Sequence, residues 1–314
     1  MSARVTRLAP SPTGRMHLGH AFSFLCAWAL ARQGGWKVLL RLEDLDAQRV
    51  TPEAEADTLW MFEWLGIDWD GPIVRQSERT AWYRECMARL ASQGLVFESP
   101  HSRAQVREAS APHAADALRE ASAPNEGDAV VRFPRELRPP PDEWRFVNGS
   151  VNHRLAVEPT KITVTDELRG AITVDPAEVW GDPLIWLKSG VPSYQLAVAA
   201  DDLAMGVTDV VRGEDLLESA PLQLHIRRLL GGDDSLRWWH VPLIRDESGR
   251  RLAKRHDDLA ISTLAAKGET PDGVRGRVAA WLGAIHAPQP LSTAAFLELD
   301  LRSLLPSIVW PNRP

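Results

Sequence analysis

RLAPSPTGRMHLGH, residues 7–20, is the stretch that decides the fold of this 314-residue chain. A short apolar run leads into it, and apolar residues recur at helical spacing from Leu18 onward. The pattern predicts a strand, a loop bent by proline and glycine, and a helix that begins near His17 or Leu18. His17 and His20 would then share one face of the first helical turn. Unpaired backbone N–H groups and the positive end of the helix dipole make that turn a site for phosphate oxygens.

The HxGH pattern has a second interpretation, in which it arises by chance or only caps a helix. The preceding PSPTG, residues 10–14, favours a ligand site. Its prolines stiffen the loop, and Gly14 lets the backbone approach a bound molecule.

The segment resembles the first signature of the class I aminoacyl-tRNA synthetases, in the form carried by the glutamyl and glutaminyl branch. That family has a Rossmann-type α/β catalytic domain, which makes an aminoacyl adenylate from ATP and an amino acid. The resemblance implies that His17 and His20 are catalytic. It also implies that ATP contacts Pro10, Thr13, Gly14, His17, Gly19 and His20.

Composition sets the class of protein but not its substrate. A hydrophobic fraction of 44% is ample for a packed core. The N-terminus lacks the pattern of a secretory signal, and no apolar run has membrane-spanning length. We therefore expect a cytoplasmic monomer without membrane association, with Cys26 and Cys86 as buried thiols. The net charge of −6 argues against a protein that coats nucleic acid, but it allows a tRNA enzyme with its basic residues on one face.

Gly34 and Gly35 end the first helix, and residues 36–42 (WKVLLRL) read as a buried strand that completes a βαβ unit. A nucleotide would bind above the carboxyl ends of these strands. Glu43 follows the second strand within RLEDLD and resembles the glutamate of the family's RxED motif, which accepts a hydrogen bond from the substrate ammonium. The alternative is a solvated acidic loop.

Two helices should follow, each ended by a glycine. Thr51 and Pro52 give the first its N-cap and first position, and this helix stops at Gly66. The second spans about residues 78–93. We interpret the tryptophans of this region as packing residues rather than as a platform for bases: Trp60, Trp64, Trp69 and Trp82.

Residues 99–128 read as a loosely packed insertion, because REASAP occurs twice and little of it is apolar. Relatives in the glutamyl branch carry a zinc site here that opens with CxC, but this chain has Ser99 and His101 at those positions. His101 and His113 are isolated and have no thiolates beside them. We predict no structural zinc.

Short apolar runs between residues 130 and 174 (VVRF, WRFV and AITV) predict strands of a small β-containing insertion. In the resembling enzymes an insertion at this place grips the acceptor end of tRNA. The assignment to tRNA rests on the resemblance alone.

The second half is predicted to begin with a strand at residues 193–200 and a strand over residues 209–217 that ends in a charged turn, followed by a helix near residues 220–230. The resemblance implies a glutamate pocket with Arg212 forked onto the side-chain carboxylate, which is expensive to bury without a cationic partner. The alternative for Arg212 is a structural salt bridge to Glu214 or Asp215. The whole pocket implied is Arg7, Ala9, Ser11, Glu43, Tyr194 and Arg212. Asp215 would touch the ATP ribose or cap a helix, and the residues alone do not separate these.

The basic run RLAKR, residues 251–255, lies where the family's second signature, of KMSKS type, belongs. Lys254 would be the mobile cation that closes on the ATP phosphates, with Arg251 adding charge. Two positions depart from the signature, because Arg251 replaces lysine and Ala253 replaces serine. A plain basic surface loop is the alternative.

Only 59 residues follow residue 255, and they read as helices at 261–267 and 271–285 with a proline-rich end. We expect no anticodon-binding domain in that space. The predicted division is a first Rossmann half (1–98), an insertion with a degenerate zinc region and an acceptor-end-binding part (99–180), a second Rossmann half (181–240), and the KMSKS-like loop with C-terminal helices (241–314).

Taken together, the resemblance implies that the chain activates L-glutamate with ATP and Mg²⁺. It further implies transfer of the glutamate to queuosine, the modified wobble base of tRNA(Asp). A truncated enzyme that charges a tRNA 3′ end, a nucleotidyltransferase and a non-catalytic tRNA-binding relative remain as alternatives.

Overall fold

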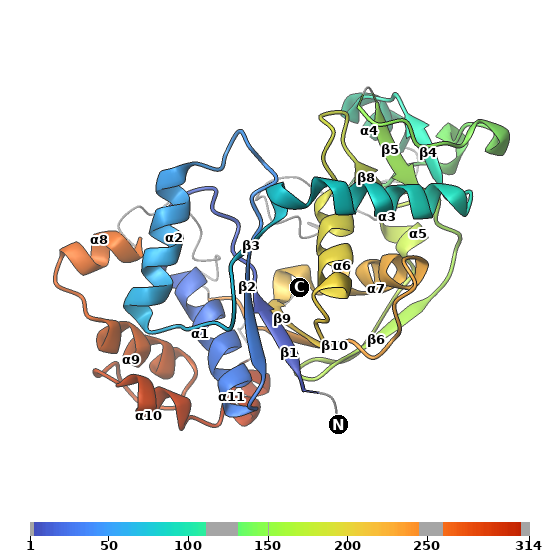
Figure 1. The fold of residues 1–314 in the computed structure, drawn as a ribbon. Helices are drawn as coiled ribbons and strands as arrows, with labels where there is room; N and C mark the ends of the chain where they lie inside the picture. The colour runs from blue at the N-terminus through green and yellow to red at the C-terminus, as the bar shows by residue number, and fades with distance from the viewer. Residues whose placement is uncertain (1–2, 111–130, 150, 245–259, 309–314) are drawn as a thin grey trace.

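The computed structural model describes residues 3–110, 131–149, 151–244 and 260–308. Its first half is the predicted βαβ unit extended by one further strand (Figure 1). Parallel pairing joins β1 to β2 and β2 to β3, which confirms the α/β class. The elements are β1 (Val5–Leu8), α1 (Leu18–Gln33), β2 (Lys37–Leu42), α2 (Pro52–Leu65), β3 (Val74–Arg75), the 3-10 turn η1 (Gln76–Arg79) and α3 (Thr80–Ser92).

The second half forms a four-stranded sheet in the order β7-β6-β10-β9, and β9 lies beside β1. The Thr208 N–H, just before β9, donates to the Val5 carbonyl at 2.9 Å. The two sheets therefore meet at β1 and β9, the kind of switch point at which α/β proteins bind ligands. The elements are β6 (Ile162–Asp166), β7 (Gly170–Val174), α6 (Tyr194–Ala204), β9 (Asp209–Gly213), η5 (Glu214–Leu216), α7 (Ser219–Leu229) and β10 (Arg237–Val241).

The predicted strand at residues 193–200 is wrong, because this segment begins helix α6. Ser193 is its N-cap, and its side chain accepts a hydrogen bond from the Leu196 N–H. Residues 196–202 are all buried, so the helix has no polar face to show its period. A short apolar run of this kind does not distinguish a buried strand from a buried helix.

The third sheet, in the order β4-β5-β8, stands at one end of the molecule (Figure 1). Of the three strands predicted between residues 130 and 174, AITV is a strand, β7. Val130 of VVRF lies outside the described residues, and residues 131–133 make one isolated bridge, at Phe133. WRFV, which is described throughout, has no strand structure. The elements here are β4 (Val96–Ser99), α4 (Arg103–Ser110), η3 (Arg135–Leu137), η4 (Pro141–Glu143), β5 (Asn152–Leu155), α5 (Pro176–Val179) and β8 (Leu184–Trp186).

The sheets do not follow the predicted boundary at residue 180. The β6–β7 hairpin precedes that residue but shares its sheet with β9 and β10. Likewise, β8 follows it but pairs with β5. Val106 of α4 is buried against Phe97 and Phe133, so the start of the predicted loose insertion is packed, whereas residues 111–130 lie outside the described chain. The division into domains stays a prediction.

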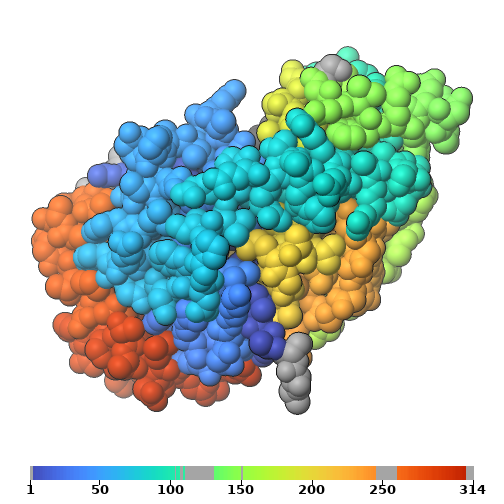
Figure 2. Space-filling model, in the orientation of Figure 1, coloured from blue at the N-terminus to red at the C-terminus, as the bar shows by residue number. Residues whose placement is uncertain are grey.

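Four short helices follow residue 260 in the part of the chain that the structure describes, and they pack beside α1 and α2, as the orange and red segments of Figures 1 and 2 show. The two helices predicted after residue 260 are confirmed, although the second ends at Trp281 rather than near residue 285. Two more follow in the proline-rich end. The four are α8 (Ile261–Ala266), α9 (Pro271–Trp281), α10 (Thr293–Leu297) and α11 (Leu301–Ser307).

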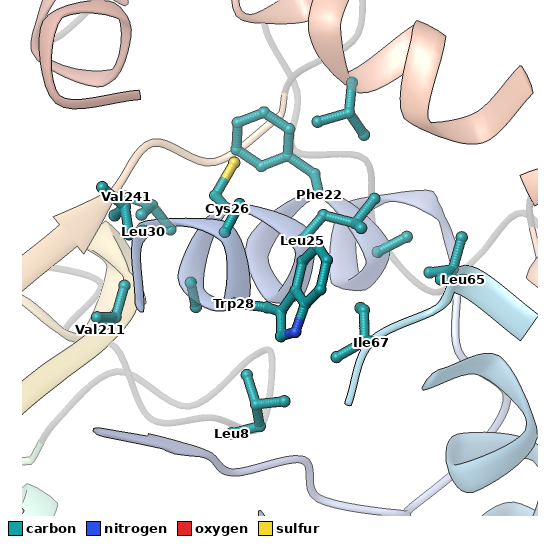
Figure 3. Packing of buried hydrophobic residues seen from close by; sticks show 14 of the residues in the cluster. Leu8, Phe22, Leu25, Cys26, Trp28, Leu30, Leu65, Ile67, Val211 and Val241 are labelled. Carbon is teal, nitrogen blue, oxygen red and sulfur yellow. The ribbon is translucent and has the colours of Figure 1, made fainter. Parts of the chain in front are cut away.

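Helix α1 is the centre of the largest hydrophobic core. Its side chains leave it on opposite sides: Phe22 and Cys26 point one way and Trp28 the other (Figure 3). Both cysteines are free buried thiols, as predicted, and burial raises the pKa of Cys86 to about 12. Trp60 departs from its predicted packing role, being 36% exposed and stacked on Trp64. Within the described ranges, no helix has the length and apolar character needed to cross a membrane.

Asp201 of α6 joins the two halves of the fold. Its carboxylate is fully buried and accepts hydrogen bonds from Gln76 at 2.9 Å, Arg79 at 2.7 Å and Tyr83 at 2.7 Å. All three donors belong to η1 and α3 of the first half, so one carboxylate satisfies the buried Gln76 and Tyr83 as well as the partly exposed Arg79.

Replacing Asp201 by Asn should therefore lower the free energy of unfolding by about 3–5 kcal/mol, the usual effect of removing one partner from a buried charged network. Asp234→Asn is the control, since Asp234 forms an exposed ion pair with Arg228 that is worth less than about 1 kcal/mol. Urea unfolding followed by circular dichroism measures both. Equal losses in the two variants would contradict the role given to Asp201.

Candidate active site

One cavity opens at the carboxyl ends of β1, β2 and β9, beside the first turn of α1. It contains every predicted glutamate-site residue and, among the described residues predicted for ATP, all but Gly14. A Cβ at Gly14 would meet no protein atom within 4 Å, so the fold itself does not require glycine there. The predicted residues in the cavity wall are Arg7, Ala9, Pro10, Ser11, Thr13, His17, Gly19, His20, Glu43, Tyr194, Arg212 and Asp215.

His17 and His20 form the predicted pair at the start of α1. His17 is the N-cap, and its Nδ1 accepts from the Gly19 N–H at 3.2 Å. The His20 Nδ1 accepts in turn from the His17 N–H at 3.2 Å, and the two ring centroids are 3.8 Å apart. Because each Nδ1 accepts, the ring proton of each imidazole is on Nε2. Two Nε2–H donors at the positive end of a helix suit phosphate oxygens.

The loop before α1 is held in place from outside the cavity. The Asp57 carboxylate, on α2, accepts from the Met16 N–H at 2.9 Å. Beyond the gap in the described chain, the Ile261 N–H donates to the Met16 carbonyl at 2.8 Å, and Ala260 bridges to His17. Ile244, the last described residue before that gap, lines the cavity. Arg251, Ala253 and Lys254 lie outside the described residues, between two anchors at the site.

A buried charge network supports the side of the cavity where Glu43 lies. Arg41 donates to Glu43 at 3.1 Å and to Asp202 at 2.6 Å, and Arg7 donates to the same Asp202 oxygen at 3.0 Å. Asp202 is therefore shared by two arginines, which fixes both relative to Glu43. The two guanidinium groups outweigh burial at Asp202 and hold the pKa of its carboxyl below the usual range.

At Glu43 the balance is reversed. Burial is the largest influence and raises the pKa of its carboxyl above the ordinary value, against the opposing effect of Arg41 and Arg7. Desolvation and the neighbouring Glu43 also raise the pKa of Tyr194 to about 12, so its hydroxyl keeps its proton. A buried carboxylate beside a hydroxyl fits a substrate ammonium.

On acidification, glutamate binding should therefore weaken at a higher pH than it would if Glu43 had the pKa of an ordinary carboxyl group. A raised pKa means that Glu43 takes up a proton, and stops accepting from an ammonium, at a pH above the ordinary carboxyl value of about 4.3. We expect kcat/KM for glutamate to fall through that raised pKa. Glu43→Gln should remove this acid limb and lower the plateau about ten- to hundredfold. A pH profile of both proteins is the test, and an unchanged limb in the variant would assign it to another group.

Arg212 of β9 is buried, and the acceptors that it bonds among the described residues are uncharged. Its three nitrogens donate to His240 at 3.0 Å, Gln223 at 2.6 Å and the Leu216 carbonyl at 2.9 Å. Within the described ranges no carboxylate forms an ion pair with it, so the alternative of a salt bridge to Glu214 or Asp215 has no support, and Glu214 instead pairs with Arg169 at 3.1 Å. Burial is the largest influence on the pKa of Arg212 and lowers it, against the opposing effect of Tyr194, Asp202 and Asp215.

Sequence reasoning missed the residues that support the site. Asp202, His240 and Gln223 are buried polar groups behind the cavity wall, and Phe24 and Ala27 of α1 form part of the wall itself. One signal was available, since two aspartates end the apolar run AVAADD, where charge is costly without a partner. Nothing comparable marks His240.

No three metal-binding side chains come together within the part of the chain that the structure describes. His101 belongs to that part, with its imidazole beside Phe133, and His113 falls outside it. The predicted lack of structural zinc stays a prediction.

Comparison with known proteins identifies the family. The model for the family described as "tRNA synthetases class I (E and Q), catalytic domain" matches residues 4–277. A glutamyl-Q tRNA(Asp) synthetase of Rhodobacter capsulatus is 37% identical over 86% of this chain and 98% of the relative. A glutamate–tRNA ligase of Azorhizobium caulinodans is 36% identical over 95% of this chain and 61% of the relative.

The fold has a match among solved structures. Glutamate-tRNA synthetase from Elizabethkingia anophelis superposes with a TM-score of 0.77 at 23% identity, over 98% of this chain and 67% of that one. The match to the family model spans all three sheets and the cavity. The fold and this match agree with the resemblance seen in the sequence. The chain therefore belongs to the class I tRNA synthetases of the E and Q branch.

Proposed function

We propose that this chain activates L-glutamate with ATP to glutamyl-adenylate and transfers the glutamate to queuosine in tRNA(Asp). The observation that carries the first step is Arg212, a buried guanidinium that forms no ion pair with the described residues, in one cavity with Glu43 and the histidines of α1. The similarity to glutamyl-Q tRNA(Asp) synthetases over 98% of the Rhodobacter capsulatus relative supports the acceptor.

In this mechanism Arg212 binds the γ-carboxylate of glutamate and Glu43 accepts from its ammonium, with Arg7, Ser11 and Tyr194 completing the pocket. The α-carboxylate attacks the α-phosphorus of ATP, a P–O bond forms, and pyrophosphate leaves. His17 and His20 donate to the phosphate oxygens as charge builds, and Lys254 adds a cation. No side-chain nucleophile is needed, because positioning and electrostatics lower the barrier.

Mg²⁺ belongs to this proposal as a companion of the triphosphate. Magnesium is commonly held by one or two carboxylates together with substrate phosphates, and Asp215 is a carboxylate in the cavity wall. The ion would offset phosphate charge. Asp215 would alternatively contact the ATP ribose or cap a helix, and a cytoplasmic location remains a prediction.

Glutamate-dependent ATP–pyrophosphate exchange without tRNA tests the first step. We expect exchange with glutamate and little with glutamine or aspartate, since neither presents a carboxylate at the same distance. Equal exchange with the three amino acids would contradict the pocket. ATP turnover without glutamate dependence would favour a nucleotidyltransferase, and RNA binding without exchange would favour a non-catalytic relative.

The acceptor needs a separate measurement, because the similarity to a glutamate–tRNA ligase keeps a second candidate, transfer to a tRNA 3′ end. Labelled glutamate should be transferred to tRNA(Asp) that carries queuosine. Ribonuclease digestion distinguishes the two products, because the label stays either on the anticodon fragment that carries queuosine or on the 3′-terminal adenosine. Transfer to tRNA that lacks queuosine would contradict the proposed acceptor.

A further inference from the structure

Asp166, His240 and Arg212 form a row across three adjacent strands, β6, β10 and β9. His240 and Arg212 are register partners, and Asp166 pairs with Trp238, two residues before His240. Side chains two residues apart on a strand leave the same face. The three side chains therefore stand side by side behind the cavity, although they come from distant parts of the sequence.

Hydrogen bonds connect the three side chains in the order Arg212, His240, Asp166. The Arg212 Nε–H donates to His240 Nε2 at 3.0 Å, and His240 Nδ1 lies 2.7 Å from the Asp166 carboxylate. The same Asp166 oxygen also accepts from the His240 backbone N–H at 3.0 Å. Because Nε2 accepts from Arg212, the ring proton must be on Nδ1, where it donates to Asp166.

His240 and Asp166 are both fully buried. Burial is the main cause that lowers the pKa of His240 to about 4, with the Arg212 charge acting in the same direction and Asp166 opposing it. The ring is therefore neutral at physiological pH. A neutral ring with its proton on Nδ1 is the one form that bonds both neighbours at once.

The other acceptors on Arg212 are also uncharged. Gln223 Oε1 accepts a hydrogen bond from one terminal nitrogen of Arg212, and the Leu216 carbonyl accepts one from the other. Gln223 is itself oriented by Gln195 at 2.9 Å, and Gln195 donates to Ser219 at 3.1 Å. An arginine has five N–H groups, so the bonds to described residues leave one N–H on each terminal nitrogen for a ligand, enough for a fork onto two carboxylate oxygens.

We propose that His240, fixed by Asp166, is a positioning residue that makes Arg212 selective for a carboxylate over an amide. This role rests on the proposed function, and it explains how the pocket distinguishes glutamate from glutamine. A neutral acceptor holds the guanidinium plane without satisfying its charge, so the charge is left for the substrate. Glutamine would direct its side-chain NH₂ group at one of the two N–H donors of Arg212 and would leave the guanidinium charge uncompensated.

The test compares His240→Leu with His240→Gln in glutamate-dependent pyrophosphate exchange. His240→Leu removes the acceptor, and it should raise the KM for glutamate about ten- to hundredfold while the KM for ATP changes less than about twofold. It should also reduce the preference for glutamate over glutamine at least about tenfold. His240→Gln keeps an acceptor oxygen and should restore most of both properties.

The control is His153→Leu, which removes another fully buried histidine, on β5 of the third sheet, where its Nε2 accepts from the Val147 N–H at 3.2 Å. It should lower the melting temperature without moving the KM for glutamate. If His240→Leu behaves like this control, or raises both KM values alike, the positioning role is wrong. A wild-type protein without glutamate-dependent exchange would instead overturn the proposed function.

A second variant keeps the idea testable if His240→Leu does not fold. Gln223→Glu preserves the size of the side chain but places a carboxylate on Arg212. We expect a loss of glutamate binding of about a hundredfold, because the cation would already be satisfied. Gln195→Glu adds the same charge one side chain farther away and should have a smaller effect. Normal glutamate binding by a folded Gln223→Glu protein would refute the argument from neutral acceptors.

Discussion

Replacing Arg212 by Gln should lower kcat/KM for glutamate in pyrophosphate exchange by about three orders of magnitude. The variant would bury the γ-carboxylate of glutamate without a cation, and breaking a buried ion pair costs about 3–5 kcal/mol. Each 1.36 kcal/mol corresponds to about tenfold in rate. The KM for ATP should stay close to that of the wild type, because the proposed function has Arg212 bind the amino acid and not ATP.

Arg227→Gln is a matched control for this variant. Arg227 is also a buried arginine of the second half, but it binds Asp233 and lies outside the cavity wall. Its loss should change stability and leave the kinetics of glutamate unchanged. If Arg212→Gln retained kcat/KM within about tenfold, the γ-carboxylate would be bound elsewhere, and the substrate assignment would fail with it.

Lys254→Ala should lower the rate of exchange about a hundredfold at saturating glutamate. We place this lysine on the α- and β-phosphates in the transition state, and removing one donor to developing charge usually costs two to three orders of magnitude. The position of the flanking residues supports this, since Ile244 lines the cavity and Ala260 bridges to His17. An interaction made in the transition state changes kcat more than the KM for glutamate.

Lys267→Ala provides the comparison, because Lys267 follows the same segment but is exposed at the end of α8, outside the cavity wall. Its exchange rate should match the wild type. If the exchange rate of Lys254→Ala were also unaffected, residues 251–255 would be interpreted as a basic surface loop without a catalytic role.

Local signals allowed much of the site to be predicted. Apolar spacing and the glycine and proline positions predicted the strand–loop–helix at residues 7–20 and the helix cap at Thr51. Motif resemblance predicted the positions of Glu43 and Arg212 at strand ends. These features depend on residues close together in the chain. Their geometry is therefore readable before the fold is known.

Where the local pattern was ambiguous, the prediction failed. Residues 196–200 are all apolar, and only their burial between other elements determines that they form part of helix α6. The β6–β7 hairpin likewise joins β10 through pairing at Asp166 and Trp238, a contact that spans distant parts of the sequence.

The sequence by itself determined the nucleotide-binding unit, the family and most of the residues in the cavity wall. Tertiary structure alone decided how those residues are supported: that Asp202 holds Arg7 and Arg41 together, and that Asp166 sets the proton on His240 behind Arg212. The reason is physical. A motif specifies groups along the chain, whereas the orientation and charge balance of a buried group depend on strand register and on partners that meet only when the sheets form.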